Sequence, residues 1–185
     1  SQATLNQNSL AYAVYIADNI SSGADRRDSE GEKVKGFDRA RPLESIFNLL
    51  NNNNGKDTYE IREITKTINY PINTQPKDPA ADYSKILAGF TSGLSGIYFE
   101  PSYINSLLEL CEAYLSYVPA STHAGQVSDI SLYDHAKTTA ALSACIALYL
   151  ESRGLTNYRD ILFKKEKEFY DEHVFGLLSL DISGI

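Results

Sequence analysis

Apolar residues recur at helical spacing along most of the chain. The first such run predicts a helix over about residues 9–22, which Gly23 would end in a left-handed C-cap. Its apolar positions are Tyr12, Ala13, Ile16, Ala17 and Ile20. The same spacing predicts further helices at about 42–51, 83–96, 102–117, 131–153 and 157–171. We therefore expect a mainly α protein, built as a helical bundle.

Two segments depart from this pattern and predict β structure. Residues 58–70, TYEIREITKTINY, alternate apolar and polar side chains, and Tyr70 and Ile72 offer a short partner, so we expect a small β element near 58–72. The apolar run at 174–183 predicts a buried terminal strand. A buried strand needs neighbours on its edges, and few other segments of the chain offer them.

Composition limits the classes of function. The 185-residue chain has a formal charge of −7, which argues against a general nucleic-acid surface because phosphate binding uses clustered Lys and Arg. No apolar run is long enough for a transmembrane helix and no signal peptide precedes the first helix, so we expect a cytoplasmic protein without membrane contact. Cys111 and Cys145 lack metal-site spacing and are expected to be reduced core residues.

An acid and a histidine stand side by side in the segment DISLYDHAKTTAAL at 129–142. Ser131 can act as an N-cap, and Asp134 falls three residues later, where its carboxylate can reach the free amides of the first turn. His135 follows directly. Asp134 and His135 therefore form either a structural pair or a functional one, and a single Asp–His pair is not by itself a metal site. No catalytic residue is assigned from the sequence.

The stretch ADNISSGADRR at 17–27 also carries charged residues at a helix end. Asp18 falls in the last turn of the predicted helix, where a negative charge is unfavourable unless a cation, a metal or hydrogen-bond donors compensate it. It either faces water, pairs with Arg26 or Arg27, or binds a metal. The two arginines can neutralise the carbonyl end of the helix and pair with Asp25 or Asp28.

Five blocks of sequence occur in the order seen in the large subunit of type III-A CRISPR interference complexes. They are ADNISSGADRR at 17–27, RPLESIFNLL at 41–50, SYVPAST at 116–122, DISLYDHAKTTAAL at 129–142 and LLSLDISGI at 177–185. The chain resembles this Csm-type subunit along most of its length, and the ordered set is far more specific than any one block. In that family, an N-terminal HD-type domain cuts single-stranded DNA, and two palm domains convert ATP to cyclic oligoadenylate when target RNA is bound.

The resemblance implies a division of the chain and roles for individual residues. Residues 1–173 would be the later part of the HD-type helical domain, and residues 174–185 the first strand of a truncated α/β palm domain. Asp18 would be one ligand of a divalent metal such as Mn²⁺, Ni²⁺, Co²⁺ or Mg²⁺. Arg26 and Arg27 would guide single-stranded DNA into the HD cleft, a use that suits the guanidinium fork.

The same resemblance predicts what this sequence does not do alone. The His-Asp motif that the family carries upstream of the ADN block is not in this sequence, and its three histidines all follow that block. The chain alone is therefore expected not to cut DNA. ATP and Mg²⁺ would bind palm domains that are also absent from it.

Two classes of function stay open. The chain is either a fragment of an antiviral effector enzyme, or a non-catalytic helical scaffold or docking module of a multi-subunit ribonucleoprotein. The expected partners are CRISPR RNA and the other subunits of the type III-A complex. Target RNA and single-stranded DNA would contact the full-length protein.

Overall fold

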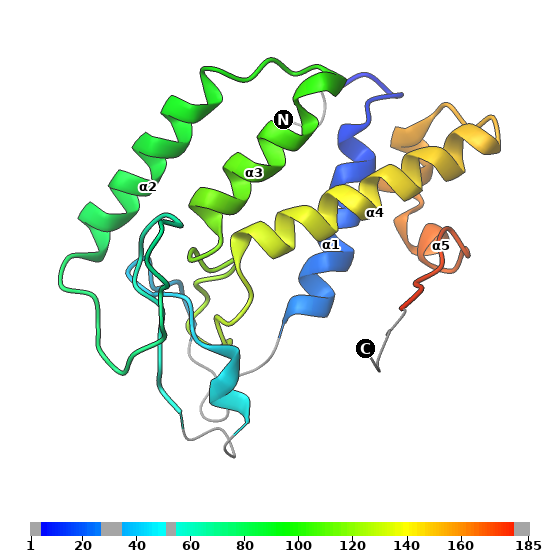
Figure 1. Cartoon of the computed structure of the whole chain (residues 1–185). Helices are drawn as coiled ribbons and strands as arrows, with labels where there is room; N and C mark the ends of the chain where they lie inside the picture. The colour runs from blue at the N-terminus through cyan, green and yellow to red at the C-terminus, as the bar shows by residue number, and fades with distance from the viewer. Residues whose placement is uncertain (1–4, 27–34, 51–54, 180–185) are drawn as a thin grey trace, which may run out of the picture. The chain divides into compact units, whose positions relative to one another are not determined.

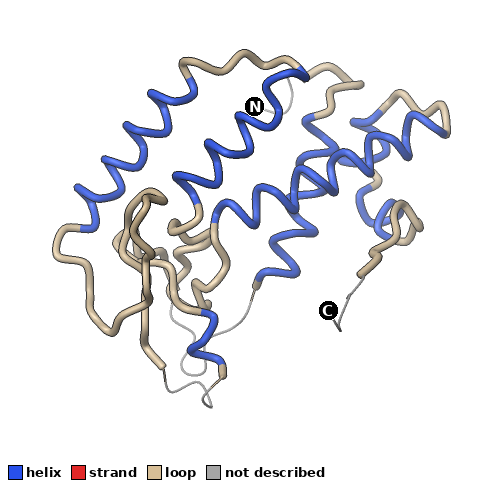
Figure 2. Tube along the Cα trace, viewed as in Figure 1, coloured by secondary structure: helices blue, strands red, loops and turns tan. Residues whose placement is uncertain are grey.

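The computed structural model describes residues 5–26, 35–50 and 55–179 (Figure 1). The chain forms two compact units, one from Ser1–Gly23 and Thr138–Ile185 and the other from Ala24–Lys137. The described residues are mainly helical, as the periodicity predicted (Figure 2). In this part of the chain, no helix is both long and apolar enough to cross a bilayer.

The first unit has an apolar core formed by helices from both ends of the chain. Helix α1 (Ala11–Asp25) and helix α4 (Leu132–Ser152) contribute side chains spaced by one helical turn. The π-helix η4 (Arg159–Lys164) and helix α5 (Glu166–Tyr170) complete the core. Its buried members are Tyr12, Ala13, Ile16, Ala17, Ile146, Leu150, Leu162 and Phe169. Burial of each large apolar side chain stabilises the fold by roughly 1.5–3 kcal/mol.

The second unit contains a helical hairpin of α2 (Pro79–Leu94) and α3 (Ile104–Leu115), which lie side by side (Figure 1). The N-cap Asp78 accepts a hydrogen bond from the Ala81 amide at 3.1 Å, and a proline occupies the first helical position. The short 3₁₀-helix η3 (Pro101–Tyr103) leads into α3. Both helices lie within a few residues of the ranges predicted from the sequence.

The helix predicted at 42–51 is wrong. Only the 3₁₀-helix η2 (Ile46–Leu49) forms there, with Ser45 as its N-cap. The side chain of Asn48 donates to the carbonyl of Asp57 at 2.9 Å and accepts from the Asp57 amide at 3.1 Å. These two bonds fix the backbone around Asn48 against the segment at Asp57, so the 3₁₀-helix does not extend into a longer helix.

The β element predicted near 58–72 is reduced to isolated bridges. Thr58 exchanges both backbone hydrogen bonds with Ile72 at 2.9 Å, and Thr58 also forms a bridge with Glu44. Among the described residues, these and two other isolated bridges take the place of strands. The alternating pattern therefore located a real pairing, but the intervening residues form a hydrogen-bonded loop instead of extending the pairing.

The terminal strand predicted at 174–183 is not confirmed. Residues 174–179 have no regular secondary structure, and 180–183 lie outside the described residues. Leu177 is 97% exposed and Leu178 is 79% exposed. A strand requires a neighbouring edge to pair with, and no such edge is provided for 174–179 by the described residues. The palm-domain boundary at 173/174 stays a prediction.

Candidate functional site

Ser131 caps the start of α4, as the sequence predicted, but the Asp134 carboxylate contacts the Ser131 hydroxyl where a first-turn amide was expected. The Ser131 hydroxyl accepts a hydrogen bond from the Asp134 amide at 3.0 Å and donates to the Asp134 carboxylate at 2.7 Å. The Ser131 carbonyl accepts the first backbone bond of the helix, from the His135 amide at 3.1 Å. Ser131 is buried, so this cap fixes the point at which α4 begins. Whether the pair Asp134 and His135 is structural or functional stays a prediction.

His135 pairs with Asp25, and the two residues lie near opposite ends of the segment Ala24–Lys137 that forms the second unit. The Nδ1 of His135 lies 2.8 Å from the carboxylate of Asp25, the last residue of α1, and the two residues are 110 positions apart. The His135 and Asp25 side chains are 15% and 26% exposed. An ionised carboxylate only accepts hydrogen bonds, so the pairing places a proton on Nδ1 and fixes the orientation of the ring.

Asp18 does not lie where the sequence predicted. Helix α1 continues to Asp25, and Gly23 has no positive φ, so the expected C-cap at Gly23 is wrong. Asp18 is therefore two turns before the helix end, on an exposed position of the first unit. The acid that faces the unfavourable end of the helix dipole is Asp25, and His135 supplies its compensating donor.

The two arginines are only partly placed. Arg26 is exposed directly after α1, whereas Arg27 lies outside the described residues. The carboxylate of Asp25, which the sequence offered as a partner for them, bonds to His135. The proposed role of Arg26 and Arg27 in guiding DNA therefore stays a prediction.

The described residues do not assemble a metal site. Within 5–26, 35–50 and 55–179, no group of three or more His, Cys, Asp or Glu side chains is placed to hold a metal ion. A catalytic site for a divalent metal such as Zn²⁺ typically uses three protein ligands and an open position. Asp25 and His135 thus form a hydrogen-bonded pair, and they are too few ligands to make a metal site by themselves.

The pairing of Asp25 with His135 was not predicted from the sequence. His135 was predicted to pair with its neighbour Asp134, and Asp25 was considered only as a partner of the arginines that follow it. The available signal was electrostatic: an acid at the C-terminal end of a helix requires a donor, and a first-turn histidine is one of few candidates.

Comparison with known proteins places these blocks in context. No protein-family model matches the chain. The single-strand-specific deoxyribonuclease Cas10/Csm1 (subtype III-A) of Enterococcus italicus is 41% identical over 195 aligned residues, which cover 99% of this chain and 26% of that protein. The Cas10/Csm1 proteins of Streptococcus thermophilus and Mycobacterium tuberculosis are 38% and 37% identical and cover 98% and 92% of the chain. This chain belongs to the Cas10/Csm1 family of subtype III-A.

Solved structures agree with this membership. A crystal structure of a Csm1–Csm4 cassette in complex with cA4 matches 78% of the chain with a TM-score of 0.53 and 26% identity. The apo Csm1–Csm4 cassette matches it with a TM-score of 0.52. The chain spans about a quarter of the length of the curated Cas10/Csm1 relatives it matches. The resemblance to a type III-A large subunit is therefore confirmed, and the chain corresponds to part of such a subunit.

Proposed function

We propose that this chain forms part of a Cas10/Csm1 subunit that cuts single-stranded DNA in type III-A CRISPR defence. Three relatives that carry the name single-strand-specific deoxyribonuclease align with nearly the whole chain at 37–41% identity. The chain contributes a helical portion of the subunit, which corresponds to the later part of its HD-type domain.

The pairing of Asp25 with His135 is the observation that carries this proposal. The blocks at 17–27 and 129–142 are the two that carry the candidate chemistry, and they are far apart in the sequence. The 2.8 Å contact between Asp25 and His135 joins the parts of these blocks that belong to the second unit. Their joining is what a shared nuclease domain requires, because its metal ligands and its framework must converge from distant segments.

The metal site of this proposed nuclease is incomplete in the described residues, as the absence of a ligand cluster there indicates. Asp18 is the one residue that we propose as a ligand, and the other ligands would come from segments of a Cas10/Csm1 subunit outside this sequence. No catalytic step is assigned to a residue of this chain. Asp25 and His135 hold the framework, and Ser131, bonded to Asp134, caps α4.

The other partners and cofactors that we propose are those of a complete Cas10/Csm1 subunit. Exposed Arg26, together with Arg27, would contact the phosphates of single-stranded DNA. CRISPR RNA, target RNA and other type III-A subunits would bind the assembled complex. ATP and Mg²⁺ would bind palm domains elsewhere in the subunit, where cyclic oligoadenylate would be made.

A second candidate is a non-catalytic helical scaffold within the same complex. It is favoured by the absence of a metal-ligand cluster from the described residues. In this case Asp18 would be an ordinary exposed acid. The two candidates differ in what a substitution at Asp18 does to the full-length protein.

The test uses a full-length Cas10/Csm1 subunit that carries this sequence, a labelled single-stranded oligonucleotide and Mn²⁺, Ni²⁺ or Co²⁺. We expect Asp18→Asn to abolish DNA cutting and to leave cyclic oligoadenylate synthesis intact, because the two sites would be separate. Asp171→Asn, at an exposed acid of the same unit, is the matched control and should change neither activity. Equal loss of both activities in Asp18→Asn would mean that Asp18 serves folding. Unchanged DNA cutting would favour the scaffold.

A further inference from the structure

The turn that joins α2 to α3 in the second unit exposes several apolar side chains (Figure 1). Phe99 is 85% exposed, the largest value for an aromatic residue in the described part of the chain, and Tyr98 and Ile104 are 67% and 56% exposed. They line an open cleft of about 280 Å³, here called the hairpin-turn cleft. Its walls include Tyr98, Phe99, Glu100, Tyr103, Ile104 and Leu107. A contiguous group of exposed apolar side chains is typical of a surface that another molecule covers.

Hydrogen bonds within the turn hold the cleft in one conformation. The Ile97 amide donates to the carbonyl of Leu94 at 3.1 Å. The Glu100 amide donates to the carbonyl of Tyr98 at 2.8 Å, and the Glu100 carbonyl accepts from the Tyr103 amide at 2.9 Å. The rings of Tyr98 and Tyr103 meet edge to face, with centroids 5.4 Å apart. The cleft is therefore preorganised, which lowers the entropic cost of binding a partner.

The size of the hairpin-turn cleft favours a single side chain over a free small molecule. Small-molecule sites usually enclose about 300–1,000 Å³ and bury most of their ligand. At about 280 Å³, this cleft lies below that range, and it is open to solvent. Its aromatic walls, Tyr98, Phe99 and Tyr103, belong to the residue class that is enriched at protein interfaces. We therefore expect the occupant to be a side chain of another protein.

The charges on the turn and on α3 are all negative. The sequence has no Lys or Arg from residue 86 to residue 136, whereas the turn and α3 carry Glu100, Glu109 and Glu112. Glu100 lines the cleft and is exposed, and neither Glu100 nor Glu109 forms an ion pair with a described residue. A partner that brings Lys or Arg is therefore attracted to this surface, whereas an acidic partner is repelled.

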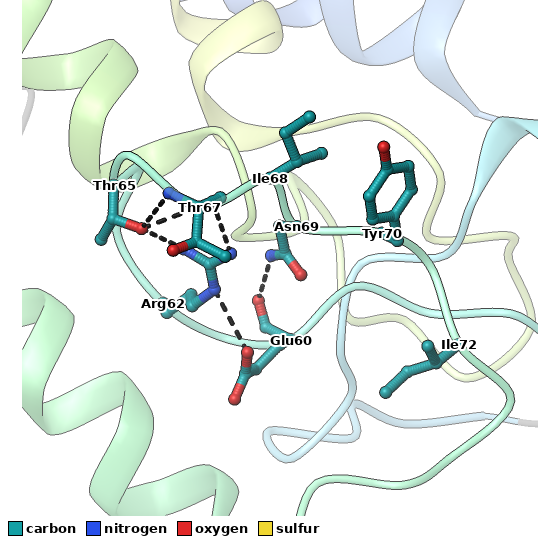
Figure 3. A pocket seen from close by; sticks show the side chains of 8 residues that line it. All are labelled: Glu60, Arg62, Thr65, Thr67, Ile68, Asn69, Tyr70 and Ile72. Atoms are coloured by element: carbon teal, nitrogen blue, oxygen red, sulfur yellow. Dashed lines mark hydrogen bonds and ion pairs between the residues drawn. The ribbon is translucent and has the colours of Figure 1, made fainter.

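The cleft in the loop at 60–72 shows no such preference. Its one lining carboxylate, Glu60, is paired with its one lining guanidinium, Arg62, at 3.1 Å (Figure 3). These two charges cancel. The hairpin-turn cleft has a carboxylate and no cation among its lining residues. Charge therefore selects an occupant at the hairpin turn and not at the loop.

We propose that the hairpin-turn cleft binds a basic segment of a separate protein partner, with one apolar side chain of that segment seated in the cleft. The seated side chain covers Phe99 and Tyr98, and the Lys or Arg residues beside it are attracted by Glu100. A second copy of this chain is disfavoured, because it would bring the same carboxylates face to face. Nucleic acid is disfavoured, because the lining residues offer no cation to a phosphate. This inference goes beyond the proposed nuclease role, which uses no residue of the cleft.

The first test uses the 185-residue chain and three synthetic peptides with blocked ends. They are the basic peptide Gly-Lys-Lys-Phe-Lys-Lys-Gly, its acidic counterpart Gly-Glu-Glu-Phe-Glu-Glu-Gly, and Gly-Lys-Lys-Gly-Lys-Lys-Gly, which lacks the apolar side chain. Binding is followed by NMR through the amides of residues 96–108. We expect saturable shifts confined to this segment with the basic peptide, and affinity at least about tenfold lower for each of the other two. Failure of the basic peptide to bind here, or equal affinity for either of the others, would overturn the proposal.

Matched variants identify the residues responsible. Phe99→Ala removes the most exposed wall of the cleft and should weaken binding of the basic peptide by about tenfold. Its control is Leu87→Ala, at a residue of α2 that is 66% exposed but does not line the cleft, and its affinity should be unchanged. Glu100→Gln should weaken binding by about threefold, as expected for one exposed ion pair, and its control Glu63→Gln should not. Phe99 is exposed, so its variant should fold, and unchanged affinity in Phe99→Ala would contradict the proposal.

Two further measurements test the other possible occupants. In sedimentation velocity, we expect the chain to stay monomeric as its concentration is raised, and a dimer that Phe99→Ala disrupts would place a second copy in the cleft. We also expect a full-length Cas10/Csm1 subunit that carries this sequence to bind the basic peptide with the same affinity as the 185-residue chain. Loss of binding in the full-length subunit would mean that another of its domains covers the cleft. Either of these contrary results would show that the proposal is wrong.

Discussion

Asp25 at the end of α1 and His135 in the first turn of α4 are in contact at 2.8 Å, although 110 residues separate them in the sequence. Both side chains are largely shielded from solvent, so their hydrogen bond should contribute about 1 kcal/mol to the free energy of unfolding. A double-mutant cycle with Asp25→Ala and His135→Ala, measured by chemical denaturation, should give a coupling energy of that size.

An exposed ion pair in the same unit is the control for this cycle. Lys85 and Asp82 lie 3.1 Å apart on α2, and the lysine side chain is 75% exposed. Because solvent screens exposed pairs, their coupling energy should be below about 0.5 kcal/mol. Coupling between Asp25 and His135 no larger than that of Lys85 and Asp82 would mean that the buried pair does not stabilise the framework.

The cap at the start of α4 gives a second prediction. Asp134→Ala should lower the free energy of unfolding by about 1 kcal/mol, because Ser131 loses its side-chain partner and the first turn loses a favourable charge. Glu151→Ala, at an exposed position of the same helix, should change stability by less than about 0.5 kcal/mol. Thermal melts of the 185-residue chain measure both effects.

The same substitution tests whether the pair Asp134 and His135 is structural in the full-length subunit. If it is structural, Asp134→Ala and His135→Ala should reduce DNA cutting and ATP consumption together, in proportion to the fraction folded. Loss of one activity at unchanged melting temperature would instead assign the pair a direct chemical role.

The sequence predicted the helices better than the contacts between them. Periodicity located α1, α2, α3 and α4 within a few residues, because an amphipathic helix must repeat its apolar positions every turn. The cap formed by Ser131 and Asp134 was also predictable, since it is local. The predicted helix end at Gly23 was wrong: α1 continues to Asp25, whose contact with His135 is not visible in the local pattern.

Contacts between residues far apart in the sequence could not be predicted from local sequence patterns. Residues 60–72 form a loop in place of the predicted strand. The guanidinium of Arg62 donates to the carbonyls of Glu63 and Thr67 and to the Thr65 hydroxyl. In a strand, such carbonyls would accept hydrogen bonds from a neighbouring strand instead. Tertiary contacts of this kind override local propensity.

The crossing of α2 and α3 depends on two glycines one turn apart. A Cβ at Gly89 would overlap the ring of Tyr114, and a Cβ at Gly93 would overlap the side chain of Leu110. Gly89→Ala should therefore lower the free energy of unfolding by about 1–3 kcal/mol, the usual cost of overpacking. Gly93→Ala should cost less, because the Leu110 methyl groups can rotate away whereas a ring must move as a whole.

Gly23 provides the control for these two substitutions. It also lies in a helix, but nothing stands within 4 Å of the position its Cβ would take. Gly23→Ala should raise the free energy of unfolding by about 0.5–1 kcal/mol, because alanine is the better helix former. Urea denaturation of the three variants should give opposite signs for Gly23→Ala and Gly89→Ala. A stabilising Gly89→Ala would show that the close crossing is not required.

Tyr83 makes stability depend on pH at the alkaline end. Burial, assisted by the negative charge of Asp38, raises the pKa of Tyr83 from 10.0 to about 12, and its hydroxyl donates to the carbonyl of Arg41. The folded state therefore favours the neutral phenol. Its contribution is fully present below pH 10 and is lost as the pH rises through about 12, because the unfolded chain releases this proton first.

Tyr83→Phe removes both the hydrogen bond and the titrating group. At pH 8 it should lower the free energy of unfolding by about 1 kcal/mol, the net value of one hydrogen bond. The gap between the wild-type chain and Tyr83→Phe should then narrow as the pH is raised from 10 towards 12, since only the wild-type chain loses this contribution. Urea denaturation of both proteins across this range provides the measurement. A gap that stays constant with pH would mean that Tyr83 titrates alike in the folded and unfolded chains.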